Sequence, residues 1–278
     1  MNIIKWEEFL IPYEQAVDEL TGKFRAYSRE MRKKGLHCPI EYVEGRVKKV
    51  SSILEKAHRK GIHYGQVEER MEDIAGVRII CRFVEDIQRV AAVIRERNGV
   101  DMEIIEEKDY ISDGKSSGYR SYHINIRYPM WTVNGVKSVA AEIQIRTMAM
   151  NFWATIEHSL KYKYNHNIPR ELQKRLISAA EASYSLDVEM SAIREEIMEV
   201  QRVLNRKNDL VDEIIGGIGV LYTSGLNNIE EIHARFLMVY EQDDLEKLLE
   251  FKRQLEVLSD LYKATPYKSF SPADRSVR

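Results

Sequence analysis

Two short segments that alternate apolar and polar residues, separated by an Asn-Gly pair, constrain the fold of this chain more than any other feature. They are residues 121–128 and 141–146, and Asn134-Gly135 lies between them. This dipeptide favours the tight turn of a β-hairpin. Because successive side chains of a strand point to opposite faces, one row of each segment faces the core and the other faces outward. The sequence therefore predicts paired strands with one apolar and one polar face.

The predicted polar face collects side chains capable of acid–base chemistry and hydrogen bonding in a small area. Its members are Ser121, His123, Asn125 and Arg127 from the first segment, and Glu142, Gln144 and Arg146 from the second.

The other patterns add strands and helices around this pair. Residues 76–83 and 102–106 are short and apolar, which favours strands. Apolar residues at helical spacing predict helices over residues 6–34, 41–60, 86–97, 147–164 and 169–204. The predicted fold class is α+β, with a mixed sheet of four to five strands and flanking helices.

The pattern changes after residue 205, where three glycines interrupt an apolar segment. Sequences that resemble capping boxes predict two further helices, near 229–240 and 244–262. We therefore expect a main domain over 1–205 and a helical C-terminal extension over 206–265. The polar, Pro-containing stretch 266–278 is expected to be a disordered tail.

Composition narrows the class of protein. The net charge is −2, from 42 basic and 44 acidic residues, which disfavours a bulk nucleic-acid binder. Two cysteines provide no disulfide framework, and we see neither a leader nor an apolar run long enough for a membrane span. These features predict a cytoplasmic globular protein.

The stretch from Arg46 to Lys60 is dense in basic residues. On the predicted helix, Arg46, Lys49, Lys56 and Lys60 share one sector, and Lys48 and Arg59 lie beside it. The stripe is either a solvated face or a binding surface for the oxygens of a polyphosphate.

Two carboxylates are candidate metal ligands. Asp73 precedes the strand at 76–83, and Glu142 lies on the polar face of another strand. Asp73 could equally be a helix cap. Because Mg²⁺ commonly takes only one or two protein carboxylates besides phosphate and water, the two fit a magnesium site.

A polar, Gly-containing loop covers residues 108–121. Tyr119 lies beside Gly118 near its end, where the ring could anchor the loop or stack on a purine base.

Several nucleotide and metal motifs are missing from the sequence. It has no P-loop, no zinc-ligand spacing and no His-Asp pair of the kind used by metal phosphohydrolases, and Gly217-Ile-Gly219 lacks the third glycine of a dinucleotide fold.

In this order, the segments resemble the synthetase domain of the RelA/SpoT homologues, in particular the short single-domain alarmone synthetases of the RelQ and RelP type. The similarity covers roughly residues 10–200. It is carried by five motifs: Glu41-Tyr-Val-Glu-Gly-Arg-Val-Lys48, Glu72-Asp-Ile-Ala-Gly-Val-Arg78, Lys108-Asp-Tyr-Ile-Ser112, Gly118-Tyr-Arg-Ser-Tyr-His123 and Ala141-Glu-Ile-Gln-Ile-Arg-Thr147.

The resemblance implies a nucleotidyltransferase-like fold and a GTP or GDP pyrophosphokinase without hydrolase activity. It implies that ATP is held by Arg46, Lys48, Lys56, Arg59 and Arg78. Asp73 and Glu142 would bind Mg²⁺, and Glu142 would act as the catalytic base. The acceptor nucleotide would be held by Lys115, Tyr119, His123, Gln144 and Asn151.

The resemblance also implies a homotetramer, and it leaves open an allosteric site for (p)ppGpp or RNA. No membrane partner is expected. The acceptor loop departs from the family pattern, so the preference among GTP, GDP and GMP stays open, as does the role of residues 208–278. Two other classes remain as alternatives: a catalytically silent nucleotide or RNA sensor, and a nucleotidyltransferase, although the closely spaced Asp pair of the latter is not found.

Overall fold

The computed structural model describes residues 5–112, 114–163, 169–223 and 228–261, and it divides into two compact units, 1–193 and 194–278. The predicted tail, 266–278, lies outside the described residues. None of the described helices has the length and apolar character needed to span a bilayer.

The first unit is built on a five-stranded sheet with strand order β1-β2-β5-β4-β3. The strands are β1 (Tyr42–Val47), β2 (Ala75–Cys81), β3 (Glu103–Asp109), β4 (Tyr122–Thr132) and β5 (Gly135–Thr147). β2 and β5 run parallel, and the other neighbours are antiparallel. The mixed sheet confirms the predicted fold class. The β4–β5 hairpin turns at Gly135, whose φ of 100° lies in a region that suits glycine.

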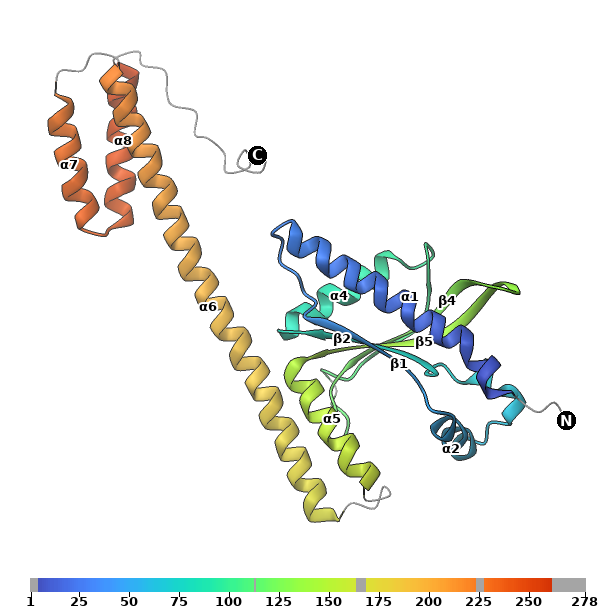
Figure 1. Cartoon of the computed structure of the whole chain (residues 1–278). Helices are drawn as coiled ribbons and strands as arrows, with labels where there is room; N and C mark the ends of the chain where they lie inside the picture. The colour runs from blue at the N-terminus through green and yellow to red at the C-terminus, as the bar shows by residue number, and fades with distance from the viewer. Residues whose placement is uncertain (1–4, 113, 164–168, 224–227, 262–278) are drawn as a thin grey trace. The chain divides into compact units, whose positions relative to one another are not determined.

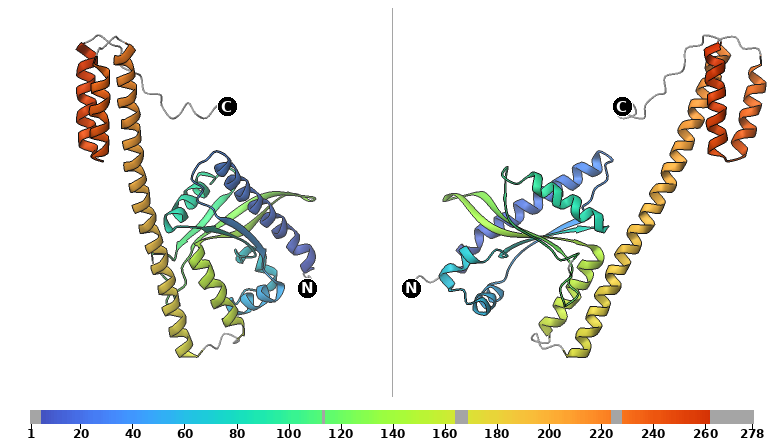
Figure 2. Two further views of the ribbon diagram at one scale, coloured as in Figure 1. Left: turned by 60° about the vertical axis from the view of Figure 1, so that its left-hand side comes forward. Right: turned by 180° about the vertical axis from the view of Figure 1, so that it is seen from behind.

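Helices cover both faces of this sheet (Figures 1 and 2). α1 and α4 lie on one face, and α2 and α5 lie on the other. The helical elements of this unit are α1 (Trp6–Lys33), α2 (Val50–Lys60), the 3₁₀ turn η1 (Tyr64–Gln66), α3 (Val67–Arg70), α4 (Val84–Glu96), α5 (Met148–Lys163) and the first part of α6 (Arg170–Thr223).

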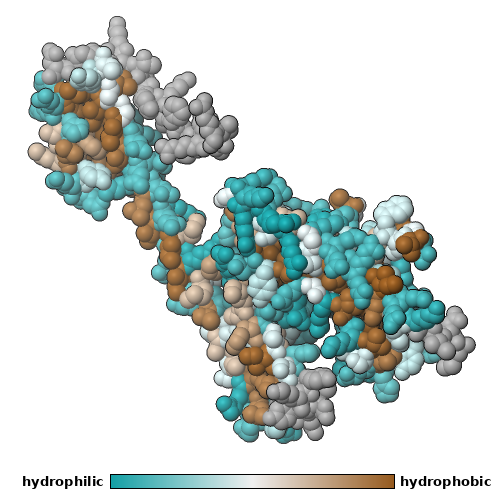
Figure 3. Space-filling model, viewed as in Figure 1, coloured by the Kyte–Doolittle hydropathy of each residue, from teal (hydrophilic) through white to brown (hydrophobic). Residues whose placement is uncertain are grey.

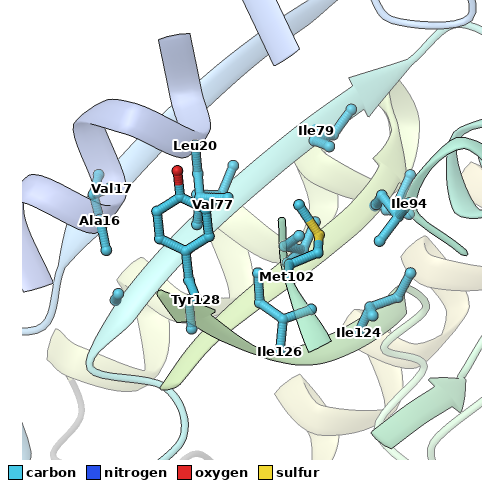
Figure 4. Close-up of a cluster of buried hydrophobic side chains, with 14 of the residues drawn as sticks. Ala16, Val17, Leu20, Val77, Ile79, Ile94, Met102, Ile124, Ile126 and Tyr128 are labelled. Carbon is cyan, nitrogen blue, oxygen red and sulfur yellow. The ribbon is translucent and has the colours of Figure 1, made fainter. Parts of the chain in front are cut away.

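The core lies between the sheet and helices α1 and α4, as Figure 4 shows. Ile124, Ile126 and Tyr128 of β4 are at most 1% exposed, which confirms the predicted apolar face. The opposite face is not simply solvated, because His123 and Asn125 are each only 9% exposed. Their polar groups are buried beside other polar groups, so this face is built to hold a site.

The prediction of one helix over residues 41–60 is wrong. The first part forms strand β1, which pairs with β2, and α2 begins only at Val50. Gly45 shows why long-range packing decides this segment. A Cβ atom there would lie 2.4 Å from Val17 Cγ1 and 2.6 Å from Thr21 Oγ1, so only glycine lets α1 approach β1 this closely. Arg46 and Lys56 therefore do not share a helix face.

The second unit contains the C-terminal part of α6 (Arg170–Thr223), α7 (Ile229–Glu241) and α8 (Leu245–Leu261). These helices enclose their own core, which includes Ile214, Leu221, Phe236 and Phe251. The predicted helices near 229–240 and 244–262 are confirmed. α6 runs on past the predicted end at residue 204, and the boundary between the units falls at 193/194 within it rather than at 205/206.

Asp187 on α6 is a buried carboxyl group in the first unit. It is 5% exposed and accepts a 2.6 Å hydrogen bond from Thr147 Oγ1, which also caps the start of α5. Burial is the main reason that its pKa rises to about 6, and Glu85 adds to the effect.

We expect Asp187→Asn to stabilise the protein at pH 7.5 but not at pH 4. A raised acid pKa means that the native state favours the protonated form, so Asp187 contributes stability below pH 4 that is lost as the pH rises to about 6. Asparagine cannot ionise, and the gain at pH 7.5 is at most about 3 kcal/mol. Thermal unfolding of both proteins at the two pH values measures it, and an equal shift at both would contradict the assignment.

Candidate active site

Two lysines from different elements converge on Asp73 at the edge of the polar face. Lys48 follows β1, and Lys56 lies on α2; each Nζ is 2.6 Å from the same oxygen, Asp73 Oδ2. All three side chains are at most 20% exposed. A compact pair of ammonium groups around one carboxylate is a suitable place for a polyphosphate and its counter-ion.

Asp73 has one oxygen available for a ligand. Oδ1 is buried without a hydrogen-bond partner. Burial alone would raise the pKa of Asp73, but the two lysines outweigh it and hold the pKa below its usual value. The carboxylate is therefore ionised at neutral pH.

Glu142 lies on β5 beside β2, directly opposite Gly76 in the parallel register. Its Oε1 is 2.9 Å from His123 Nδ1, and its Oε2 accepts a 2.6 Å bond from Gln144 Nε2. Burial would raise the pKa of Glu142, but the hydrogen bond and charge of His123, together with Gln144, leave the pKa lowered. Glu142 is thus a fixed, ionised carboxylate.

A chain of hydrogen bonds leads from Glu142 to the loop residue Tyr119. Tyr119 OH lies 2.8 Å from His123 Nε2 and accepts a 2.6 Å bond from Arg146 Nη2. Arg146 can only donate and an ionised carboxylate can only accept, so Arg146 donates to the Tyr119 hydroxyl and His123 Nδ1–H donates to Glu142, while the direction of the Tyr119–His123 bond is set by the tautomer of His123. The Tyr119 ring, which could stack on a purine, is therefore linked by hydrogen bonds to Glu142, the candidate catalytic base.

Arg46 and Arg78 lie together. They line a cavity of about 350 Å³ with Arg25, Glu44 and Gly45. Arg46 and Gly76 are register partners across β1 and β2, and the Arg46 side chain passes over Gly76. Burial and the charge of Arg46 lower the pKa of Arg78. Two planar cations in one cavity suit a base or an anion.

The loop between β3 and β4 brings Lys115 to the aromatic residues of the site. Lys115 Nζ lies 4.1 Å from the centre of the Tyr110 ring and 5.0 Å from that of Tyr119. Gly118 makes this path possible, because its φ is +84° and a Cβ would lie 2.6 Å from Ala180 Cβ. Tyr119 itself is partly buried against the small cluster around Trp153.

Two predicted site residues are less closely joined to this group. Arg59 is exposed in the last turn of α2, and among the described residues no hydrogen bond or ion pair links it to the others. Asn151 on α5 donates a 3.3 Å bond to Tyr42 OH, and its Oδ1 is buried without a partner.

The structure adds residues to which the sequence analysis assigned no role. Asn125 is the register partner of Glu142, donates a 2.7 Å bond to Glu72 Oε2, and keeps a buried Oδ1 without a partner. Arg146 is 4% exposed and orients Tyr119. Both belong to the alternating polar row, so the period-2 pattern was the signal for them. Arg25 reaches the site from α1, and no local pattern marks it, whereas Tyr110 belongs to the Lys108–Ser112 motif.

The site fits a magnesium ion with few protein ligands. Among the described residues no cluster of three or more His, Cys, Asp or Glu side chains is arranged around a metal position. Mg²⁺ does not require one, because one or two carboxylates and phosphate oxygens suffice. The unpartnered Asp73 Oδ1 supplies one ligand atom, and Glu142 is close enough for the charge of Asp73 to affect its pKa.

Comparison with known proteins agrees with this architecture. Residues 45–167 match the region found in RelA / SpoT proteins. The chain is 53% identical over 207 residues to the GTP pyrophosphokinase YjbM of Bacillus subtilis, covering 74% of this chain and 97% of that protein. It is 43% identical to the GTP pyrophosphokinase YwaC of the same organism, covering 69% and 91%. The chain belongs to the RelA/SpoT family.

Within this family the chain groups with the small alarmone synthetases. The crystal structure of the small alarmone synthetase 1 from Bacillus subtilis, bound to its product pppGpp, superposes with a TM-score of 0.67 at 53% identity. The match covers 69% of this chain and 98% of that structure. The remaining 31% of this chain lies outside that match.

Proposed function

We propose that the protein is a GTP pyrophosphokinase that transfers the β,γ-pyrophosphate of ATP to the 3′-hydroxyl of GTP or GDP, giving (p)ppGpp and AMP. The observation that carries the proposal is the pairing of two lysines on Asp73 next to an ionised Glu142, in a chain 53% identical to a GTP pyrophosphokinase.

The donor side of the site is proposed to hold ATP. Arg46 and Arg78 would enclose the adenine in their shared cavity, and Lys48 and Lys56, with Arg59, would hold the phosphates. Asp73 and Glu142 would hold Mg²⁺, which when bound neutralises charge on the triphosphate. The two lysines now paired with Asp73 would turn to the phosphate oxygens.

The acceptor side is proposed to lie around the Tyr119–His123–Glu142 chain. Tyr119 would stack on guanine, and the acceptor would be lined by Lys115, His123, Gln144 and Asn151. Burial lowers the pKa of Lys115, while Glu142 opposes this effect. Lys115 would thus provide a desolvated cation for the acceptor phosphates.

The reaction needs a base at the 3′-hydroxyl. Glu142 would take the hydroxyl proton as the 3′-oxygen forms a bond to the β-phosphorus and the bond to the oxygen of AMP breaks. The hydrogen bonds from His123 and Gln144 fix the carboxylate for this step. A carboxylate with a lowered pKa is a weak base, so positioning and charge neutralisation must carry most of the rate.

A nucleotide separation tests the proposal. The protein is incubated with Mg²⁺ and ATP together with GTP, GDP or GMP in turn. We expect a guanine nucleotide with two additional phosphates and an equal amount of AMP, and the relative rates rank the acceptors. ATP left intact with every acceptor would contradict the enzyme and favour a silent nucleotide or RNA sensor. Release of pyrophosphate instead of AMP would indicate a nucleotidyltransferase.

We expect Tyr119→Ala to raise the KM of the guanine acceptor by roughly 10-fold, because base–aromatic stacking is lost. The KM of ATP should stay within twofold. Tyr119→Phe keeps the ring but loses the hydroxyl bonded to His123 and Arg146. It should therefore retain the acceptor KM and change the pH profile of kcat. Equal KM values for the Ala variant and the wild type would remove the stacking role.

The resemblance to the family also supports a proposal about where the enzyme is located, how it assembles and which ligands regulate it. We place it in the cytoplasm as a homotetramer, with (p)ppGpp or RNA as candidate allosteric ligands. Sedimentation of the purified chain checks the assembly, and a monomer at every concentration would contradict it.

A further inference from the structure

Asn125 is a buried amide whose oxygen has no hydrogen-bond partner. The residue lies on β4 within the polar face of the sheet and is 9% exposed. Figure 3 shows large hydrophilic areas on the surface of the first unit, where water satisfies polar groups. Asn125 Oδ1 instead lies inside the protein, and within the described part of the chain no group donates a hydrogen bond to it. An unpaired buried atom of this kind costs stability, so its presence indicates a role in binding.

The carboxylate of Glu72 determines which atom of the amide is left over. Asn125 Nδ2 donates a 2.7 Å hydrogen bond to Glu72 Oε2. A carboxylate only accepts hydrogen bonds, so the amide must present its nitrogen to Glu72 and keep its oxygen for another partner. Glu72 directly precedes Asp73, the proposed magnesium ligand. This hydrogen bond therefore ties Asn125 to the segment that carries the site.

The neighbours of Asn125 in the sheet do not supply the missing donor. Its register partners are Glu142 on β5 and Glu106 on β3, and both side chains end in acceptor groups. His123 lies two residues earlier on the same face, but its Nδ1 is bonded to Glu142 and its Nε2 to Tyr119. The donor for Asn125 Oδ1 is therefore expected from a bound molecule.

The position of Asn125 indicates which part of the substrates reaches it. Directly opposite residues of antiparallel strands have Cβ atoms about 4.5–5.5 Å apart, so Asn125 and Glu142 lie side by side. The proposed adenine site, between Arg46 and Arg78, lies on β1 and β2, with β5 between it and β4. The guanine is assigned to Tyr119, and ionised phosphate oxygens only accept hydrogen bonds. The substrate donors that remain next to Glu142 are the hydroxyl groups of the acceptor ribose.

We propose that Asn125 Oδ1 accepts a hydrogen bond from the 2′-hydroxyl of the acceptor ribose. The 2′- and 3′-hydroxyls are neighbours on the sugar ring, just as Asn125 and Glu142 are neighbours across β4 and β5. With the 3′-hydroxyl at Glu142, the 2′-hydroxyl lies toward Asn125. The bond would hold the 3′-oxygen in position for attack and select ribonucleotides over 2′-deoxyribonucleotides. This inference rests on the proposed function.

A comparison of GTP with 2′-deoxyGTP as acceptors tests the inference, because both carry the reacting 3′-hydroxyl. For the wild type we expect kcat/KM to be at least about 10-fold higher with GTP, since the deoxynucleotide leaves the buried oxygen unpaired. Asn125→Leu replaces the amide by an apolar side chain of similar size and should reduce this ratio to less than about threefold, mainly by slowing the reaction of GTP. If GDP is the better acceptor, GDP and 2′-deoxyGDP are compared in the same way.

Two further variants separate recognition of the sugar from a general effect on the fold. Arg127→Gln changes an exposed residue at the next position on the same face of β4 and should keep the wild-type ratio. Asn125→Asp combined with Glu72→Gln reverses the donor and the acceptor of the pair and again leaves one oxygen free. This double variant should therefore keep the preference for the ribonucleotide. Circular dichroism checks folding, and the smaller Asn125→Ala replaces Asn125→Leu if leucine does not fit.

A wild type that uses the two acceptors equally well would overturn the inference. So would an unchanged ratio in Asn125→Leu, because an equal loss with both acceptors would show that the amide serves a metal-bound water or the fold. Absence of product from the wild type with both GTP and GDP would contradict the proposed function, and the inference with it.

Discussion

Replacing Glu142 by glutamine is expected to lower turnover by at least about 10²-fold while ATP binding stays largely intact. Glutamine has nearly the same shape, but its side chain cannot accept the proton of the 3′-hydroxyl. It also places an amide against Gln144, which donates to this position in the wild type. Single-turnover rates and binding of a non-hydrolysable ATP analogue measure the two effects.

A loss of turnover without a loss of ATP binding would be specific for the role of Glu142 as a base. A variant that lost ATP binding in proportion to its rate would show a structural or metal-binding role instead. Normal turnover of Glu142→Gln would remove the base assignment. Gln144→Ala is a useful companion because it removes one hydrogen bond to Glu142 and leaves the carboxylate in place, so its loss should be smaller.

Asp73→Asn is expected to reduce turnover by a similar or larger factor, on the order of 10²- to 10³-fold, because a proposed metal ligand and the partner of two lysines are lost together. Lys48 and Lys56 would remain available to phosphate oxygens. ATP should therefore bind without Mg²⁺ about as well as in the wild type, while the gain in affinity on adding Mg²⁺ should disappear.

Glu72→Gln is the matched control for Asp73→Asn, because it neutralises the neighbouring carboxylate, which bonds to Asn125. Its Mg²⁺-dependent gain in ATP affinity should persist. Titration calorimetry with and without Mg²⁺ compares the two variants. If Asp73→Asn kept the full gain, Asp73 would serve only to hold the lysines.

Local patterns predicted most of the sheet. The β4–β5 hairpin follows from strict alternation and from Asn134-Gly135, and β2 follows from a short apolar run. β1 was missed because it is defined by its pairing with β2 and by the close passage of α1 over Gly45. These contacts join distant parts of the chain, and no local period signals them.

For α6 the sequence pattern predicted too little helix, because the helix was expected to end at residue 204 and runs to Thr223. Gly216, Gly217 and Gly219 suggested an interruption, since glycine weakens a helix by up to about 1 kcal/mol per residue. The helix continues because Ile214, Ile218 and Leu221 of the same segment are buried against α7 and α8. Burial of three large side chains outweighs the cost of the glycines.

The carboxylates and basic residues of the candidate site can be predicted from the sequence, but their arrangement cannot. Arg46 and Lys56 do not share a helix face, and yet both face the site, because β1 pairs with β2 and Lys56 of α2 reaches Asp73 just before β2 begins. What could not be read from the sequence is the connection among Tyr119, His123 and Glu142, since it depends on side-chain geometry across two strands and a loop.

That connection limits how the enzyme can change. If Tyr119 recognises the guanine ring and Glu142 removes the proton, then His123 joins selectivity to reactivity through one series of hydrogen bonds. A substitution that refits the acceptor pocket would also alter the basicity of Glu142. Acceptor choice and catalytic rate would therefore evolve together, and variants with a new acceptor preference would need compensating changes around His123 before they regained speed.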